Sequence, residues 1–142
     1  MEEMRLTLAL GSNMGDREEN IRTALKELES VFGRPVELSD MLETAAVGFE
    51  APDFINSVAV YRCSLDPYEV LSECKRIERK MGRTDLPEWD ASGNRVYHNR
   101  IIDIDILTYG ETSMSEKDLV IPHPAVFSRP FIKELLLNLR PL

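Results

Sequence analysis

With 142 residues, of which 43% are hydrophobic and 30% charged, the chain is long enough to bury one hydrophobic core without disulfide support. Its formal net charge of -8 argues against a general nucleic-acid binder, because such proteins present basic surfaces to phosphates. No stretch approaches the ~20 apolar residues of a membrane span, and Cys63 and Cys74 form no CxxC pair, which is typical of reduced thiols. We therefore expect a single domain over residues 1–142 of a cytoplasmic protein that binds neither nucleic acid nor membrane.

The first third of the chain changes from a strand pattern to a helix pattern and back. Leucines at every second position of "MRLTLALGSN" predict a first strand that ends at Gly11 and leads into a tight loop. Asp16, with Glu19 three residues later, predicts a capped helix start, and the helical spacing of apolar residues continues until Gly33. A second strand is expected over residues 36–44.

The middle of the chain repeats this alternation and then loses it. "FINSVAVYRC", residues 54–63, predicts a third strand, and Asp66 followed by Pro67 predicts a helix that ends at Gly82. Residues 83–98, "RTDLPEWDASGNRVYH", are polar and lack a hydrophobic period. Because a loop of this length inside a compact domain is usually functional, we expect a lid that closes over bound substrates.

A strand with unusual carboxylates follows, in "NRIIDIDIL", residues 99–107. Alternation puts three isoleucines on one face and Asp103 and Asp105 on the other, about 7 Å apart along the strand. Two such carboxylates repel each other and are costly to desolvate, so we expect a positive partner, either arginine or a divalent cation. Hard oxygen ligands without cysteine or histidine favour Mg²⁺ whose shell is completed by substrate phosphates, although a solvated edge strand is the simpler alternative.

The order of these elements predicts the fold class. Strand, helix, strand, strand, helix and strand, followed by a terminal helix around residues 132–139, is typical of an α+β, ferredoxin-like split β-α-β sandwich. We expect a four-stranded, mainly antiparallel core sheet with helices packed on one face, plus the C-terminal helix.

Phosphate-binding groups are harder to recognise. The chain contains neither a GxxxxGK[ST] loop nor a GxGxxG turn. Arg83, Arg95 and Arg100 lie in or beside the long loop, and guanidinium groups match phosphate oxygens, but such arginines also occur on ordinary exposed faces. Of these, Arg100 is the strongest candidate because it lies next to the acidic strand. His123, between two prolines, is by itself more often a turn residue than a catalytic base.

Five segments, taken together and in this order, resemble the 6-hydroxymethyl-7,8-dihydropterin pyrophosphokinases of folate biosynthesis. They span nearly the whole chain and are "GSN" (11–13), "PDFIN" (52–56), "RIERKMGR" (76–83), "RIIDIDIL" (100–107) and "IPHPAVFSRPF" (121–131). The resemblance implies a ferredoxin-like fold and an enzyme that transfers diphosphate from ATP to the pterin hydroxymethyl group, giving AMP and the pterin diphosphate. It implies two Mg²⁺ ions, ATP as co-substrate, and no obligatory protein partner.

The resemblance also assigns roles to individual positions. Asp103 and Asp105 would hold the metal ions, Asn56 would bind the pterin, and Phe131 would stack on it. In full, it implies catalytic Arg83, Arg100, Asp103 and Asp105; nucleotide-side Lys75, Glu78, Arg95, Ile106, His123 and Arg129; and substrate-binding Gly11, Asn13, Thr44, Val47, Phe54, Asn56, Trp89 and Phe131.

The sequence departs from this family pattern in the long loop. "TDLPEWDASGN" brings acidic residues where relatives carry an arginine cluster, so Arg95 is expected to replace a missing phosphate contact and Trp89 to cover the pterin. Two other classes of function compete with the pyrophosphokinase: a non-catalytic ferredoxin-like binding domain and a two-metal nuclease or phosphohydrolase. Metal-dependent binding of ATP together with a pterin would distinguish a pyrophosphokinase from both of these alternatives.

Overall fold

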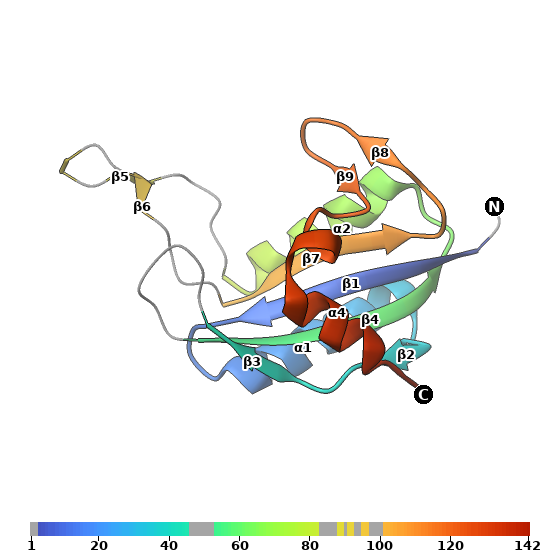
Figure 1. The fold of residues 1–142 in the computed structure, drawn as a ribbon, viewed down its shortest axis with the longest axis horizontal. Coiled ribbons are helices and arrows are strands. Elements are labelled where there is room, and N and C mark those ends of the chain that lie inside the picture. Colours follow the sequence, from blue (N-terminus) through green and yellow to red (C-terminus); the bar gives the residue numbers. More distant parts are fainter. Residues whose placement is uncertain (1–2, 46–52, 83–87, 90, 93–94, 97–100) are drawn as a thin grey trace.

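The computed structural model describes residues 3–45, 53–82, 88–89, 91–92, 95–96 and 101–142. Within them the chain is a mixed α+β structure whose main sheet is antiparallel, with strand order β10-β2-β4-β1-β7 and with β3 also paired to β4 (Figure 1). The strands of this sheet are β1 (Met4–Ser12), β2 (Glu37–Leu38), β3 (Leu42–Thr44), β4 (Phe54–Cys63), β7 (Asp103–Tyr109) and β10 (Arg140–Pro141). The three long strands, β1, β4 and β7, confirm the alternating patterns, although β7 begins only at Asp103, after the non-strand residues 101–102, and continues beyond its predicted end to Tyr109.

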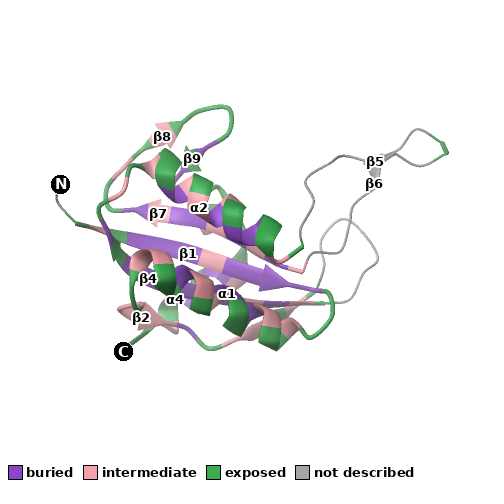
Figure 2. Cartoon of the chain, turned by 180° about the vertical axis from the view of Figure 1, so that it is seen from behind, coloured by how far each residue is buried: buried purple, intermediate pink, exposed green. Residues whose placement is uncertain are grey.

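Two long helices cover one face of the sheet, as Figure 2 shows from behind. The first, α1 (Arg17–Phe32), starts at the predicted cap, where the Asp16 carboxylate accepts from the Glu19 N–H at 3.2 Å. The second, α2 (Pro67–Lys80), starts at Asp66 with a complete capping box. The main core lies between these helices and the sheet, and includes the isoleucine face of β7.

A shorter helical segment lies against the opposite face of the sheet (Figure 1). It consists of α3 (Ala125–Ser128) and α4 (Pro130–Leu137), and its apolar residues form a second, smaller core with Val58 and Leu107. The prediction placed the helices on one face with an added C-terminal helix; the structure shows that this last helix lies across the sheet from α1 and α2. The sheet is therefore covered on both faces.

The single strand predicted over residues 36–44 is wrong, because β2 and β3 are separate. The Ser39 hydroxyl accepts from the Val58 N–H at 2.8 Å, so a side chain takes the place of a ladder acceptor. The residue after Ser39 also leaves the sheet, because the Asp40 N–H donates to the Asn138 side chain at 2.9 Å. The second contact joins the end of β2 to the end of α4, and the chain pairs with β4 again only at Leu42.

Other boundaries also differ from the sequence patterns. Helix α4 begins at Pro130 rather than at 132, because proline at the first helical position needs no N–H partner, and it ends at Leu137, just before Asn138. The predicted loop 83–98 contains a short antiparallel pair, β5 (Glu88–Trp89) and β6 (Arg95–Val96), and a second pair is formed by β8 (Met114–Ser115) and β9 (Val120–Ile121). In the described part of the chain, no helix is long and apolar enough to cross a membrane.

Candidate active site

Strand β1, which lies between β4 and β7, carries small residues opposite the candidate functional side chains of those two strands. Gly11 on β1 lies opposite Asn56 of β4 on one side and Asp103 of β7 on the other. Two residues earlier, Ala9 lies opposite Asp105 in the same way. Because alternate residues of a strand share a face, Gly11 and Ala9 lie on the same face of the sheet. They form the floor of a depression between the longer side chains of β4 and β7. A Cβ at Gly11 would approach the Asn56 Oδ1 to 3.1 Å, so the floor has little spare height there.

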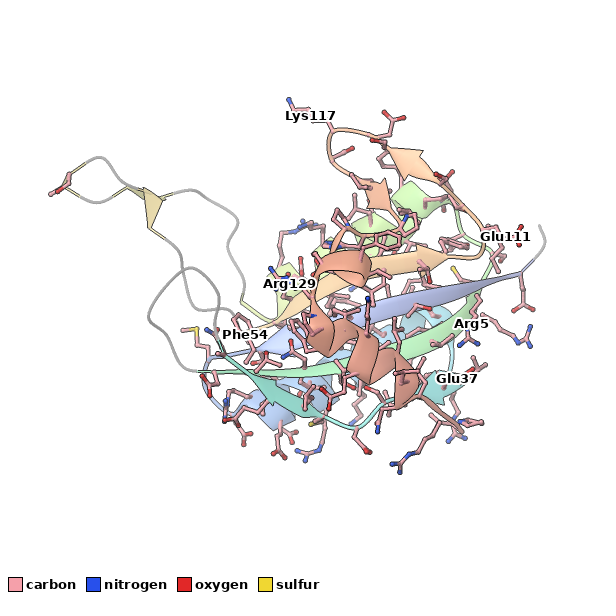
Figure 3. The ribbon with its side chains drawn as sticks, in the orientation of Figure 1. Arg5, Glu37, Phe54, Glu111, Lys117 and Arg129 are labelled. Carbon is pink, nitrogen blue, oxygen red and sulfur yellow. The ribbon has the colours of Figure 1, made fainter. Side chains whose placement is uncertain are left out.

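This floor, with α3 and α4 above it, encloses a cavity of about 320 Å³. Such a volume suits a small organic ligand. Figure 3 shows Phe54, at the start of β4, and Arg129, between α3 and α4, on this side of the molecule, whereas Arg5 and Glu37 lie at the other end of the sheet. The residues that line the cavity are Ala9, Leu10, Gly11, Thr44, Ala45, Phe54, Asn56, Asp103, Asp105, Leu107, His123, Ala125, Arg129, Phe131, Ile132 and Leu135.

One end of the cavity combines aromatic rings with an oriented amide. The Asn56 Nδ2 donates to the Thr44 Oγ1 at 2.6 Å, which fixes the amide against β3. Its Oδ1 therefore faces Gly11, as the short distance to a Cβ at that position shows. Phe54 and Phe131 line the same cavity and offer flat apolar surfaces. This end can accept hydrogen bonds from a planar, polar heterocycle and pack against its faces.

The other end is charged. Asp103 and Asp105 are partly exposed on β7, and the same cavity is lined by His123 and Arg129. The His123 Nδ1 accepts from the Ala125 N–H at 3.0 Å, so a neutral imidazole carries its proton on Nε2. Burial lowers the pKa of His123, which Asp103 opposes and Arg129 reinforces. The Arg129 guanidinium also lies 5.9 Å from the centre of the Phe131 ring.

The metal-binding capacity of this end rests on the two aspartates. Among the residues that the structure describes, no group of three or more His, Cys, Asp or Glu side chains forms a protein-only cage for a metal ion. Two carboxylates on alternate positions of one strand, lining one cavity, nevertheless match how proteins hold Mg²⁺, with substrate phosphates supplying further oxygens. The donor set fits magnesium and does not fit zinc, which prefers histidine and cysteine.

Comparison with known proteins decides the family. A sequence model of the family 7,8-dihydro-6-hydroxymethylpterin-pyrophosphokinase matches residues 7–141. The chain belongs to this pyrophosphokinase family. A relative from Porphyromonas gingivalis, a 2-amino-4-hydroxy-6-hydroxymethyldihydropteridine pyrophosphokinase, is 39% identical over 136 residues, covering 94% of this chain and 89% of that protein. The enzyme of the same name from Bacillus subtilis is 34% identical over 127 residues, covering 88% of this chain and 71% of the relative.

Some relatives are larger. A mitochondrial folate synthesis bifunctional protein from Pisum sativum is 37% identical over 139 residues, which are 97% of this chain but 25% of that protein.

Half of the positions that the resemblance to pyrophosphokinases singled out converge on the cavity. They come from four separated parts of the chain: the end of β1, the β3–β4 pair, β7 and the α3–α4 segment. These residues are Gly11, Thr44, Phe54, Asn56, Asp103, Asp105, His123, Arg129 and Phe131.

The remaining positions do not join them in the described structure. Asn13, Lys75, Glu78 and Ile106 do not line the cavity; Ile106 packs into the main core on the helix side of β7, and Asn13 is buried beyond the end of β1. Val47, Arg83 and Arg100 lie outside the described residues, and so do the side chains of Trp89 and Arg95. Their proposed contacts with ATP or pterin stay predictions.

The sequence reasoning missed the apolar part of the cavity. Ala9 and Leu107 share the faces of Gly11 and Asp105, and strand alternation from those residues points to them. Ile132 and Leu135 lie three residues apart on α4, the spacing of one helix face, but nothing local indicates that this face packs against the sheet with Val58 and Leu107.

Proposed function

We propose that this cavity is where the chain transfers diphosphate from ATP to 6-hydroxymethyl-7,8-dihydropterin. Family membership makes the chain a pyrophosphokinase of folate biosynthesis, and the reaction gives AMP and the pterin diphosphate. The observation that carries the placement is the row Asn56–Gly11–Asp103 across three strands, which joins an amide to a carboxylate over a glycine floor. A pterin bound at the amide end thus presents its substituent toward the charged end.

The pterin subsite follows from the aromatic end. In this subsite the Asn56 amide, which is oriented by its hydrogen bond to Thr44, accepts a hydrogen bond from the pterin ring. Gly11 has no side chain and leaves room for the ring beside that amide. Phe131 is to stack on the ring, with Phe54 on the β4 side of the cavity. A phenylalanine at position 54 contributes contact area without a hydroxyl donor.

The triphosphate subsite follows from the charged end. Arg129 supplies a guanidinium group and His123 an Nε2–H donor, and both suit phosphate oxygens. Asp103 and Asp105 are to hold two Mg²⁺ ions, which when bound neutralise the triphosphate and polarise the attacked phosphorus. The chain itself positions the hydroxymethyl oxygen, orients the phosphates and excludes water, and such positioning supplies much of phosphoryl-transfer catalysis.

The core topology that carries this site is proposed to be ferredoxin-like. The order β2-β4-β1-β7, with antiparallel neighbours and with α1 and α2 following β1 and β4, supports two interlocked β-α-β halves. We regard β3, β10 and the α3–α4 segment as additions to that core. The last of these closes the cavity on the face opposite to α1 and α2.

The test of the proposed function is AMP formation, measured by chromatography, from ATP and Mg²⁺ with and without the dihydropterin. AMP should appear only when pterin and metal are both present. Asp103→Asn, which removes one metal-binding charge at nearly constant shape, should lower turnover by about 100-fold or more, as expected from the loss of charge stabilisation in the transition state. Formation of ADP or of free phosphate would instead indicate a different phosphotransferase or a hydrolase.

A further inference from the structure

Glu78 is a buried carboxylate outside the cavity. It lies on α2, its exposed fraction is 1%, and it is absent from the cavity lining. The Lys75 ammonium lies 3.6 Å from its Oε1, and the Lys75 side chain is 40% exposed. Burying a carboxylate is costly, so a position like this one indicates a specific task.

The task is visible in its hydrogen bond. The Glu78 Oε2 accepts from the backbone N–H of Ile104 at 2.7 Å. Strand β7 is at the end of the main sheet, so along its outer side the described structure offers Ile104 no neighbouring strand. A carboxylate that takes the place of a missing strand gives a short, charge-assisted bond to an N–H that would otherwise be buried without an acceptor.

Ile104 is the residue between Asp103 and Asp105. On the inner side these aspartates are opposite Gly11 and Ala9. The regular register ends soon afterwards, because Leu107 is an extra residue of β7 that has no partner on β1. On the outer side, the Leu107 carbonyl accepts from the His123 N–H at 2.9 Å. The aspartate segment is thus held from outside at two points, Glu78 and His123.

We propose that Glu78 is a positioning residue for the diphosphate-transfer reaction: through the Ile104 N–H it fixes the strand segment that presents Asp103 and Asp105 to the metal and triphosphate. This inference rests on the function proposed above. It gives Glu78 a role through the backbone of β7, whereas the resemblance to relatives suggested contact with the nucleotide. A small outward shift of Ile104 would move both carboxylates together, because they flank it.

Two conservative substitutions separate the effect of side-chain length at position 78 from the effect of its negative charge. Glu78→Gln keeps an oxygen at the same distance from the Ile104 N–H but removes the charge, whereas Glu78→Asp keeps the charge but withdraws the oxygen by one methylene. Positioning predicts that Glu78→Asp is the more harmful change. Glu73→Asp and Glu73→Gln are matched controls, since Glu73 is on the same helix, is partly exposed, and pairs with Arg76.

The first readout does not use activity. Amide hydrogen exchange of Ile104 in ¹⁵N-labelled protein should accelerate about tenfold or more in Glu78→Asp, the size expected for a lost hydrogen bond to a charged group, and should accelerate less in Glu78→Gln, which keeps a neutral hydrogen bond. The second readout is steady-state kinetics. Glu78→Asp should lower kcat up to about 100-fold and raise the Mg²⁺ concentration needed for half-maximal rate, because a misplacement near 1 Å is that costly. The dissociation constant of the pterin should stay unchanged.

Each remaining outcome overturns a defined part of the account. If Glu78→Gln is as harmful as Glu78→Asp, the charge and not the strand contact matters, and the positioning role is wrong. If Ile104 exchange and the Mg²⁺ requirement of Glu78→Asp match those of the Glu73 controls, the role is also wrong. A parallel loss of pterin affinity would indicate general loosening and would overturn it as well. If the wild type forms no pterin-dependent AMP, the proposed function fails, whereas Ile104 exchange still decides whether Glu78 holds β7.

Discussion

Adding a single methyl group to the cavity floor should separate pterin binding from folding. In Gly11→Ala, the new Cβ would lie 3.1 Å from the Asn56 Oδ1 and 3.5 Å from the Phe54 Cδ1. The first distance is a few tenths of an ångström too short, so the Asn56 amide has to move. That amide is held at 2.6 Å by Thr44, and moving it disturbs the group proposed to bind the pterin.

The expected magnitude follows from one weakened hydrogen bond. A hydrogen bond of this kind contributes about 1–1.5 kcal/mol, so the dissociation constant of the pterin should rise about tenfold. The backbone at Gly11 does not have a positive φ, so it accommodates alanine, and the lower entropy of the unfolded chain should offset the cost of moving the Asn56 amide, which leaves stability within about 0.5 kcal/mol of the wild type. Affinity for a non-hydrolysable ATP analogue should remain near that of the wild type.

The assay is calorimetric titration of the pterin into Gly11→Ala, Asn56→Ala and the double variant, with urea unfolding as the control for folding. In the Asn56→Ala background the methyl group has lost the atom that it crowds, so it should cost little further affinity, and the two effects should be strongly non-additive. Unchanged pterin affinity in Gly11→Ala, or fully additive losses, would refute the proposed geometry of this subsite.

Three further predictions concern groups away from the cavity. Among the residues that the structure describes, the buried Tyr61 hydroxyl has no hydrogen-bond partner, and burial raises its pKa, so Tyr61→Phe should leave the free energy of urea unfolding unchanged or raise it by about 1 kcal/mol; a clear loss would contradict this. Burial also raises the pKa of the Cys74 thiol to about 12, so at pH 8 it is protonated and a thiol reagent should modify it slowly in folded protein, with fast modification as the contrary result. The hydrogen bond from Arg5 lowers the pKa of Glu37, so their small stabilising contribution should be present near neutral pH and be lost as the pH falls through the lowered pKa. Glu37→Gln should therefore match the wild type in stability only in acid, and should keep full activity because the pair lies at the far end of the sheet; a stability difference that grows in acid would contradict the assignment.

Local sequence signals were sufficient where structure depends on local contacts. The strand alternation in β1 and β4, the caps at Asp16 and Asp66, and the isoleucine face of β7 are all set by residues a few positions apart, and the structure confirms them. The family motifs also marked most of the polar residues that line the cavity. The motifs could not show that Gly11, Asn56 and Asp103 form one row across the sheet. These residues are far apart in the chain and meet only through the order of the strands.

The errors have the same physical origin. The break between β2 and β3 depends on Asn138, which is far away in the sequence, and on a side chain of Ser39 that replaces a backbone partner. The irregularity at Leu107 changes the phase of β7, so that Tyr109 joins the isoleucine face and packs in the main core. Helical spacing alone could not tell that α4 covers the opposite face of the sheet. In each case a tertiary contact overrides a pattern that is locally consistent.

The most direct test of the central claim is a crystal structure with the dihydropterin, a non-hydrolysable ATP analogue and Mn²⁺ in place of Mg²⁺, read by anomalous scattering. We expect metal peaks at the Asp103 and Asp105 carboxylates, and a pterin ring beside Asn56 with Phe131 stacked on it and its hydroxymethyl group toward the triphosphate. Metal bound away from both aspartates, or a pterin outside the cavity over Gly11, would contradict that claim.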